Sequence, residues 1–136
     1  MTTQTPKQWT TIALIFGVAL GLAAAALPSQ KISGRIELDP TIAAKVKTPA
    51  IVFVIARDEN RKGHPLLAKR IDVQRFPVAF TLGPEDAMMG GTPPSRVFLE
   101  ARIDRDGDAA THEPGAPSAS LNGVALGSTD VVLRLH

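Results

Sequence analysis

Side chains that bind metal ions occur in one dense run, Asp104-x-Asp106-Gly107-Asp108. An EF-hand calcium loop needs acids at positions 1, 3 and 5, a glycine at position 6 and a glutamate at position 12. Here the glycine comes at the fourth position of the run, and no glutamate stands at the twelfth. Asp-Gly is also a common turn dipeptide. We therefore interpret the run as a polar turn and predict no calcium site.

The histidines and methionines are the other side chains that could bind a metal or act in catalysis. His64, His112 and His136 are scattered and lack the spacing of a zinc site. The pair Met88-Met89 with a histidine elsewhere would suit copper, but packing of either methionine beneath its own loop is the favoured interpretation. No serine has the spacing of a nucleophile elbow. The sequence therefore predicts no catalytic residue, no metal site and no cofactor.

Composition and charge narrow the classes of function. The absence of cysteine excludes disulfides, iron–sulfur clusters and zinc ribbons. Residues 1–30 carry Lys7 as their only ionisable side chain, and the remainder holds 14 Lys and Arg against 13 Asp and Glu. This balance predicts no binding to nucleic acid. Arginines on predicted strands are expected to pair with acids such as Glu100. These arginines are Arg57, Arg70 and Arg102.

The sixteen residues from Ile12 to Leu27 form an apolar stretch without a polar side chain. Counted from Trp9, an interfacial aromatic, the segment has 19 residues and would make a helix of about 28 Å. We predict a cytoplasmic tail at 1–8, a transmembrane signal-anchor at 9–27 and a periplasmic domain at 31–136. The protein would then lie in a bacterial inner membrane, crossing it once.

A cleaved signal peptide is the competing interpretation of the same stretch. Ala24 and Ala26 satisfy the small-x-small rule for cleavage, although the apolar run continues through that site. Both interpretations place the domain outside the cytoplasm. If the helix is retained, Gly17 and Gly21 form a small-xxx-small face, with Ala25 beyond them, on which a partner helix would pack.

After residue 30 the periodicity changes to the alternation typical of strands. Asp39 and Pro40 resemble a helix N-cap and first position, before one or two helical turns at 41–46. The 50–56 run is apolar throughout and predicts a central strand covered on both faces. In the 96–104 strand we expect Ile103 to be buried. A seventh strand is expected within 109–125, and long loops are expected at 83–94 and 112–122. Six strands are clear: 31–38, 50–56, 66–73, 76–82, 96–104 and 129–136.

Short strands separated by turn signals, without a long helix, predict an all-β, immunoglobulin-like β-sandwich of about seven strands preceded by one N-terminal transmembrane helix. Long loops on a rigid sandwich are the usual place for binding. We therefore expect the loops that carry His64 and Pro65, and Met88 and Met89, to form the interaction surface.

The segment from Ile32 to Leu135 resembles the C-terminal immunoglobulin-like domain of the cytochrome c-type biogenesis protein CycH, also called CcmI. The order and spacing of the similar motifs agree along nearly the whole domain. These motifs lie at 32–40 (ISGRIELDP), 52–57 (VFVIAR), 63–70 (GHPLLAKR), 80–82 (FTL), 87–89 (AMM) and 97–103 (VFLEARI).

The resemblance implies a membrane-anchored periplasmic accessory factor in c-type cytochrome maturation, without catalytic residues on this domain. Its partners would be the haem-ligation machinery and a c-type cytochrome. The tetratricopeptide repeats with which that family holds apocytochrome have no room between Leu27 and Ile32. The alternative is a small structural subunit of a larger membrane electron-transfer complex, respiratory or photosynthetic, that packs through its helix and its periplasmic domain.

Overall fold

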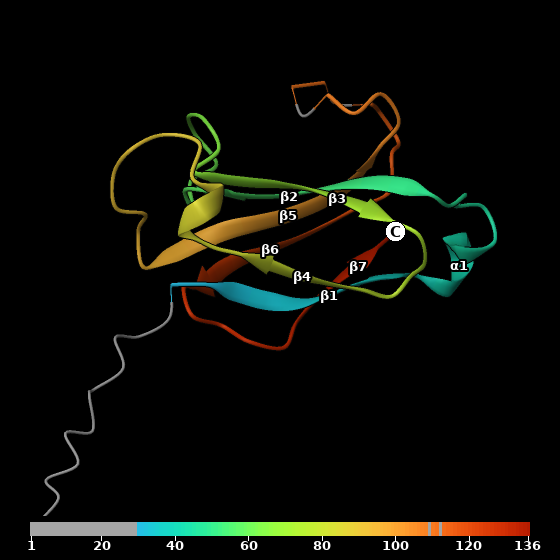
Figure 1. Cartoon of the computed structure of the whole chain (residues 1–136), viewed down its shortest axis with the longest axis horizontal. Helices are drawn as coiled ribbons and strands as arrows, with labels where there is room; N and C mark the ends of the chain where they lie inside the picture. The colour runs from blue at the N-terminus through green and yellow to red at the C-terminus, as the bar shows by residue number, and fades with distance from the viewer. Residues whose placement is uncertain (1–29, 109, 112) are drawn as a thin grey trace, which may run out of the picture.

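Seven β-strands make up most of the chain in this computed structural model, which describes residues 30–108, 110–111 and 113–136 (Figure 1). One helical turn, α1, follows the first strand, and one 3-10 turn, η1, follows the fourth. The elements in chain order are β1 (Ile32–Leu38), α1 (Pro40–Ala43), β2 (Ala50–Arg57), β3 (Leu67–Val73), β4 (Val78–Leu82), η1 (Pro84–Asp86), β5 (Arg96–Asp104), β6 (Ser118–Ala125) and β7 (Val131–Leu135).

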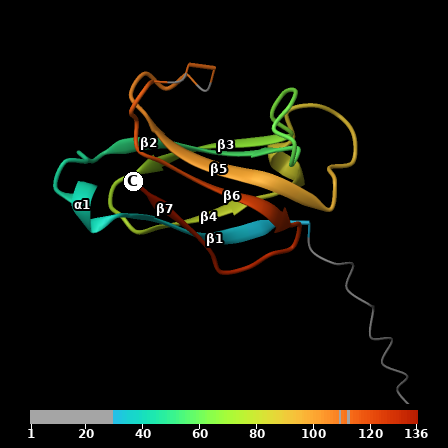
Figure 2. The same cartoon turned by 180° about the vertical axis from the view of Figure 1, so that it is seen from behind.

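The strands form two facing sheets, as Figure 1 and the reverse view in Figure 2 show. One sheet has the order β4-β1-β7 and the other β3-β2-β5-β6. All neighbouring strands are antiparallel except β1 and β7, which run parallel. This arrangement confirms the predicted all-β, immunoglobulin-like sandwich.

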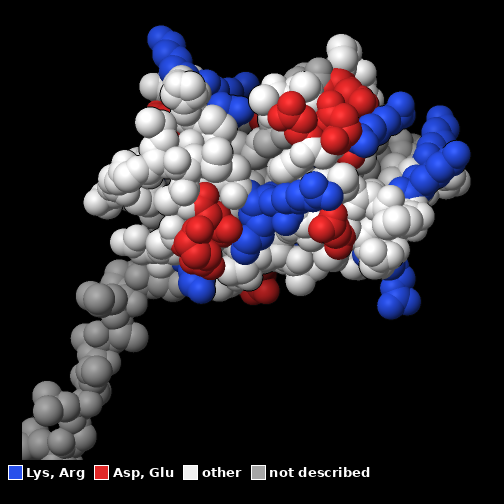
Figure 3. Space-filling view, turned by 45° about the horizontal axis from the view of Figure 1, so that its top comes forward, with Lys and Arg blue, Asp and Glu red and all other residues white. Residues whose placement is uncertain are grey.

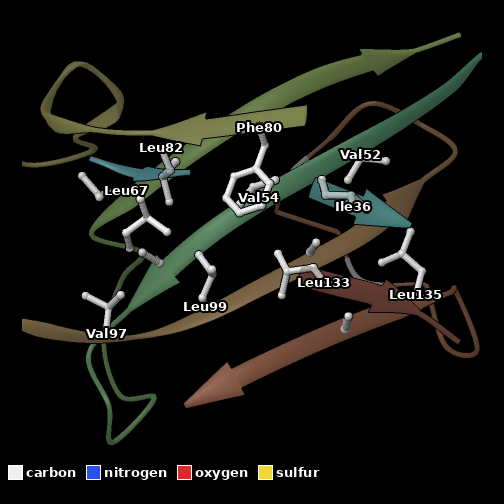
Figure 4. Close-up of a cluster of buried hydrophobic side chains, with 14 of the residues drawn as sticks. Ile36, Val52, Val54, Leu67, Phe80, Leu82, Val97, Leu99, Leu133 and Leu135 are labelled. Carbon is white, nitrogen blue, oxygen red and sulfur yellow. The ribbon is translucent and has the colours of Figure 1, made fainter. Parts of the chain in front are cut away.

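The core lies between the sheets and is filled by alternate residues of each strand (Figure 4). Ile36, Leu133 and Leu135 from one sheet meet Val52 and Val54 from the other, and all five are fully buried. The predicted burial of Ile103 is only partial. It lies one residue before the end of β5, where the sheet gives way to the 105–117 loop, so less of the core covers it.

The central strand β2 is covered on both faces, as its apolar run predicts. Phe53 and Ile55 point away from the core yet are 5% and 1% exposed. Long side chains of neighbouring strands provide this cover, because Phe53 is paired with Arg70 on β3 and Arg102 on β5. Phe53 is therefore flanked on both sides by arginine side chains, whereas Ile55 lies between Ala68 and Glu100.

Connections that alternate between the two ends of the sandwich separate its loops into two groups. One end, here called the entry end, carries residues 30–31 and the loops 58–66, 83–95 and 126–130. The far end carries 39–49, 74–77, 105–117 and His136. Figures 1 and 2 both show β1 starting beside the yellow 83–95 loop at the entry end.

Strand β6 is where the prediction is partly wrong. A loop was expected to continue to Asn122, but β6 begins at Ser118 and pairs with β5 from Arg102 onward. Its sequence SASLN has little intrinsic strand preference, and the pairing with β5 determines its conformation. The predicted helical turn with Asp39 as its N-cap and Pro40 at its first position is confirmed as a single turn: α1 ends at Ala43, and Asp39 accepts a 2.9 Å hydrogen bond from the Thr41 amide.

The predicted cytoplasmic tail at 1–8, transmembrane segment at 9–27 and Gly17/Gly21 face lie outside the described residues. Within residues 30–136, apart from 109 and 112, no helix has the length and hydropathy needed to cross a bilayer.

Candidate functional site

An open groove of about 430 Å³ lies at the entry end, between the 58–66 loop and the 83–95 loop. His64, Pro65 and Leu66 line one side, and Met89 and Pro93 line the other. Two segments that the sequence placed far apart thus form one surface, which we call the entry groove.

Backbone pairing brings the two loops together. Leu67, at the start of β3, forms an isolated β-bridge with Ala87, and the Met88 amide donates a 3.0 Å hydrogen bond to the Leu66 carbonyl. The Leu66 amide in turn donates to the Ala56 carbonyl at 2.8 Å. The groove is therefore a fixed consequence of how β2, β3 and η1 meet.

Local polar contacts shape the 58–66 loop. The Asp58 carboxylate accepts from the Asn60 amide at 3.1 Å, and the Asn60 side chain accepts from the Lys62 amide at 2.8 Å. The Arg57 guanidinium donates to the Gly63 carbonyl at 3.3 Å, so it binds backbone rather than the acid expected from the sequence. These hydrogen bonds fix the conformation of a loop that is rich in polar residues.

Arg61, in the same loop, lies over the ring of Phe98 with 4.5 Å between its guanidinium carbon and the ring centroid. Phe98 points away from the core but is only 7% exposed. A cation over an aromatic face is attracted by the ring quadrupole. This contact ties the loop to β5 and was not predicted, because Arg61 and Phe98 are far apart in sequence and no periodicity links them.

The two methionines contradict the expectation that one of them packs beneath the loop. Met88 is 57% exposed and Met89 is 64% exposed. Of the two, Met89 lines the entry groove, whereas Met88 lies beside it, next to Leu66 through its backbone. Residues 87–91 (AMMGG) follow a 3-10 turn, and nothing lies within 4 Å of where a Cβ would be at Gly90 or Gly91, so no surface is available there to cover the two side chains.

The Asp86 carboxylate fixes the start of the 83–95 loop through its Oδ2 atom. Asp86 accepts a 2.9 Å hydrogen bond from the buried Gly83 amide and lies 3.4 Å from the Lys69 ammonium. Lys69 also donates to the Thr81 carbonyl and so joins the edge strands β3 and β4 of opposite sheets. Glu85, one residue earlier, is exposed and pairs with Lys31 at 3.5 Å.

The Asp104–Asp108 run forms a turn of its own, as predicted, at the start of the 105–117 loop. Asp104 Oδ1 accepts from the Asp106 and Gly107 amides at 2.9 Å each. Asp106 accepts from the Asp108 amide at 2.9 Å and from the Thr111 hydroxyl at 2.7 Å. These hydrogen bonds, that of Asp108 first, lower the pKa of Asp106 to about 2. Local hydrogen bonds therefore explain the run.

No group of three or more His, Asp or Glu side chains is placed to hold a metal ion in the described part of the chain, which omits His112. His64 lies at the entry end and His136 at the far end. Charges of both signs are interspersed over the face seen in Figure 3, so that no extended patch of one sign appears there. Arg70 pairs with Asp72 at 3.1 Å, and Arg102 lies 3.9 Å from Glu100.

One protein family matches this chain. No curated protein and no solved structure gives a match to the chain. The family model for the Ig-like domain of cytochrome c-type biogenesis protein H matches residues 32–135, from the first residue of β1 to the last residue of β7. The chain therefore belongs to the family of the Ig-like domain of cytochrome c-type biogenesis protein H.

Proposed function

We propose that this protein is a membrane-anchored, periplasmic accessory factor of c-type cytochrome maturation that acts by binding other proteins. The observation that carries the proposal is the family match, which covers both sheets of the sandwich. Membership indicates a role in c-type cytochrome biogenesis. The apolar stretch 12–27 supports the anchor, and a cytoplasmic Lys7, the one ionisable side chain before that stretch, would place the domain in the periplasm.

Binding rather than catalysis agrees with the chemistry of the described residues. The groove combines apolar side chains, the half-buried Pro65 and the exposed Met89, with the backbone of Gly90 and Gly91. Its one histidine, His64, is exposed. Such a surface supplies apolar contact and backbone hydrogen bonds, which are what an extended polypeptide segment requires.

The partner that this proposal names is a component of the haem-ligation machinery. The entry groove is the surface we assign to it, because its apolar lining and exposed glycine backbone suit an extended segment of a partner. Gly17 and Gly21 remain a second candidate surface, on which a partner helix would pack within the membrane.

A strain lacking the gene tests the function. Its c-type cytochromes should show reduced covalent haem, measured by haem staining of denaturing gels, and the full chain should restore it. Normal haem attachment in the deletion strain would overturn the proposal. Purification of the full chain in mild detergent should then recover components of the haem-ligation machinery.

The same purification distinguishes this proposal from the alternative, a structural subunit of a membrane electron-transfer complex. Co-elution with an assembled electron-transfer complex, together with normal haem attachment, would identify a structural subunit instead.

A further inference from the structure

The chain enters the sandwich directly beside the loop that carries the exposed methionines. Ile32 pairs with Leu82, and the Lys31 ammonium lies 3.5 Å from Glu85. A Cβ at Gly83 would lie 3.0 Å from the Lys31 side chain. Met88 follows only three residues after Glu85, so the start of β1 and the methionine pair share one corner of the entry end.

Residues 87–95, here called the tip, form an apolar and uncharged part of that corner. Residues 87–95 (AMMGGTPPS) contain no charged side chain. Met88, Met89 and Leu121 are the exposed large hydrophobic residues of the described chain, and two of the three lie at this tip. In Figure 3 the lobe at the left, where Figure 1 draws this loop, is white. The tip therefore presents apolar side chains to whatever lies next to the entry end.

The sequence indicates that a membrane lies next to the entry end. Three residues, 28–30, separate the apolar stretch 12–27 from Lys31. Three residues span at most about 11 Å even when fully extended. If the stretch lies in a bilayer, the entry end cannot move far from the bilayer surface, and the tip is held close to it.

We propose that Met88 and Met89 insert into the interfacial layer of the lipid bilayer, so that the sandwich stands on the membrane by its entry end. This inference rests on the membrane anchor of the proposed function. The nearest acids are paired, Glu85 with Lys31 and Asp86 with Lys69, and residues 87–95 themselves carry no cation. The contact is therefore apolar, and it forms equally on zwitterionic and on anionic lipid.

The orientation specifies the partner further. The entry groove shares Met89 with the tip, so it opens at the level of the lipid headgroups. Its ligand is therefore a segment close to the membrane, such as the juxtamembrane part of an integral membrane protein, rather than a domain far out in the periplasm.

Fluorescent probes at single cysteines test the insertion, since the protein has no cysteine of its own. The full chain carrying Met88→Cys or Met89→Cys, labelled with an environment-sensitive dye, is reconstituted into phosphatidylcholine vesicles. The emission should shift to shorter wavelength and lose intensity when the vesicles contain headgroup spin-labelled lipid. Ala44→Cys, exposed at the far end, is the matched control and should show neither change.

Two results overturn the proposal in different ways. If the chain does not float with the vesicles, the anchor itself fails, and with it the proposed membrane location. If the chain floats but the dyes at 88 and 89 resemble the dye at 44, the anchor stands and the insertion is wrong. A shift that appears only in native membranes, and not in pure lipid, would assign the tip to a protein and also overturn the insertion.

Discussion

Gly34 on β1 lies directly against the backbone of Val131 on β7, its partner in the parallel register. A Cβ at this position would overlap the Val131 carbonyl oxygen and sit 2.6 Å from its carbonyl carbon. On the other side of β1, Gly34 pairs with Phe80, whose ring lies in the core. The absence of a side chain therefore lets the two strands approach where the sheet is parallel.

Gly34→Ala should destabilise the domain by about 1–3 kcal/mol, because the obstacle is backbone that cannot rotate away. Thermal and urea denaturation followed by circular dichroism would measure the loss. Gly90→Ala is the matched control, since no atom lies within 4 Å of its added Cβ and its φ is not positive. Equal stabilities of the two variants would show that β1 and β7 are not packed as described.

A second prediction concerns the dependence of stability on pH. Hydrogen bonds from Arg134, and then from Arg35, lower the pKa of Glu37 below its ordinary value of 4.5. Glu37 lies 2.7 Å from the Arg134 Nη2 atom and 3.2 Å from the Arg35 Nε atom. Because the folded state binds this proton less tightly, its stabilising effect is complete above the unfolded value and is lost as the pH falls through the folded value.

Glu37→Gln should therefore lower the melting temperature at pH 7, and the difference from the parent protein should shrink as the pH falls below 4.5. Asp106, whose pKa is also lowered, titrates in both proteins and does not affect the difference. A difference that stays constant between pH 7 and pH 3 would contradict the assignment of Glu37.

Strand positions could be predicted where the amino-acid pattern is strong. The alternation in β1 and the apolar run of β2 identify those strands and their faces without any tertiary information. The pattern fails in β6, where Ser118, Ser120 and Asn122 have low strand preference. There the conformation comes from pairing with β5, with a register shift between Val97 and Leu99 that local sequence does not encode.

The candidate site was predictable only in part. Proline and glycine residues predict that both loops of the entry groove are long and exposed. This prediction singles out His64 and Met89 as candidate binding residues. That the loops meet depends on the bridge between Leu67 and Ala87, a contact between distant segments. The exposure of Met88 was missed because an apolar side chain in a loop more often finds a surface to cover it.

The entry groove itself can be tested without altering the methionine tip. His64 lines the groove from the 58–66 loop, and a glutamate there would place a negative charge where we propose that a partner segment binds. His64→Glu should reduce covalent haem in c-type cytochromes severalfold when it replaces the parent chain. Thr129→Glu, exposed at the same end but in the 126–130 loop, should restore haem attachment fully. Equal activity of both variants would exclude the groove.

Adjacent acids at the base of the methionine loop should differ sharply in their contribution to stability. Asp86 is 11% exposed in its side chain, accepts from the buried Gly83 amide and lies beside Lys69. Asp86→Ala removes the partner of a buried amide, so we expect a loss of about 1–3 kcal/mol. Glu85 is half-exposed and pairs across the surface with Lys31, where solvent screens the attraction, so Glu85→Ala should leave stability nearly unchanged.

Hydrogen exchange measures the same difference locally. In Asp86→Ala the Gly83 and Met88 amides should exchange faster than in the parent protein, because the loop loses the side chain that fixes its start. In Glu85→Ala the two amides should exchange at the parent rate. Similar exchange in both variants would mean that the bridge between Leu67 and Ala87, rather than Asp86, determines the position of the loop.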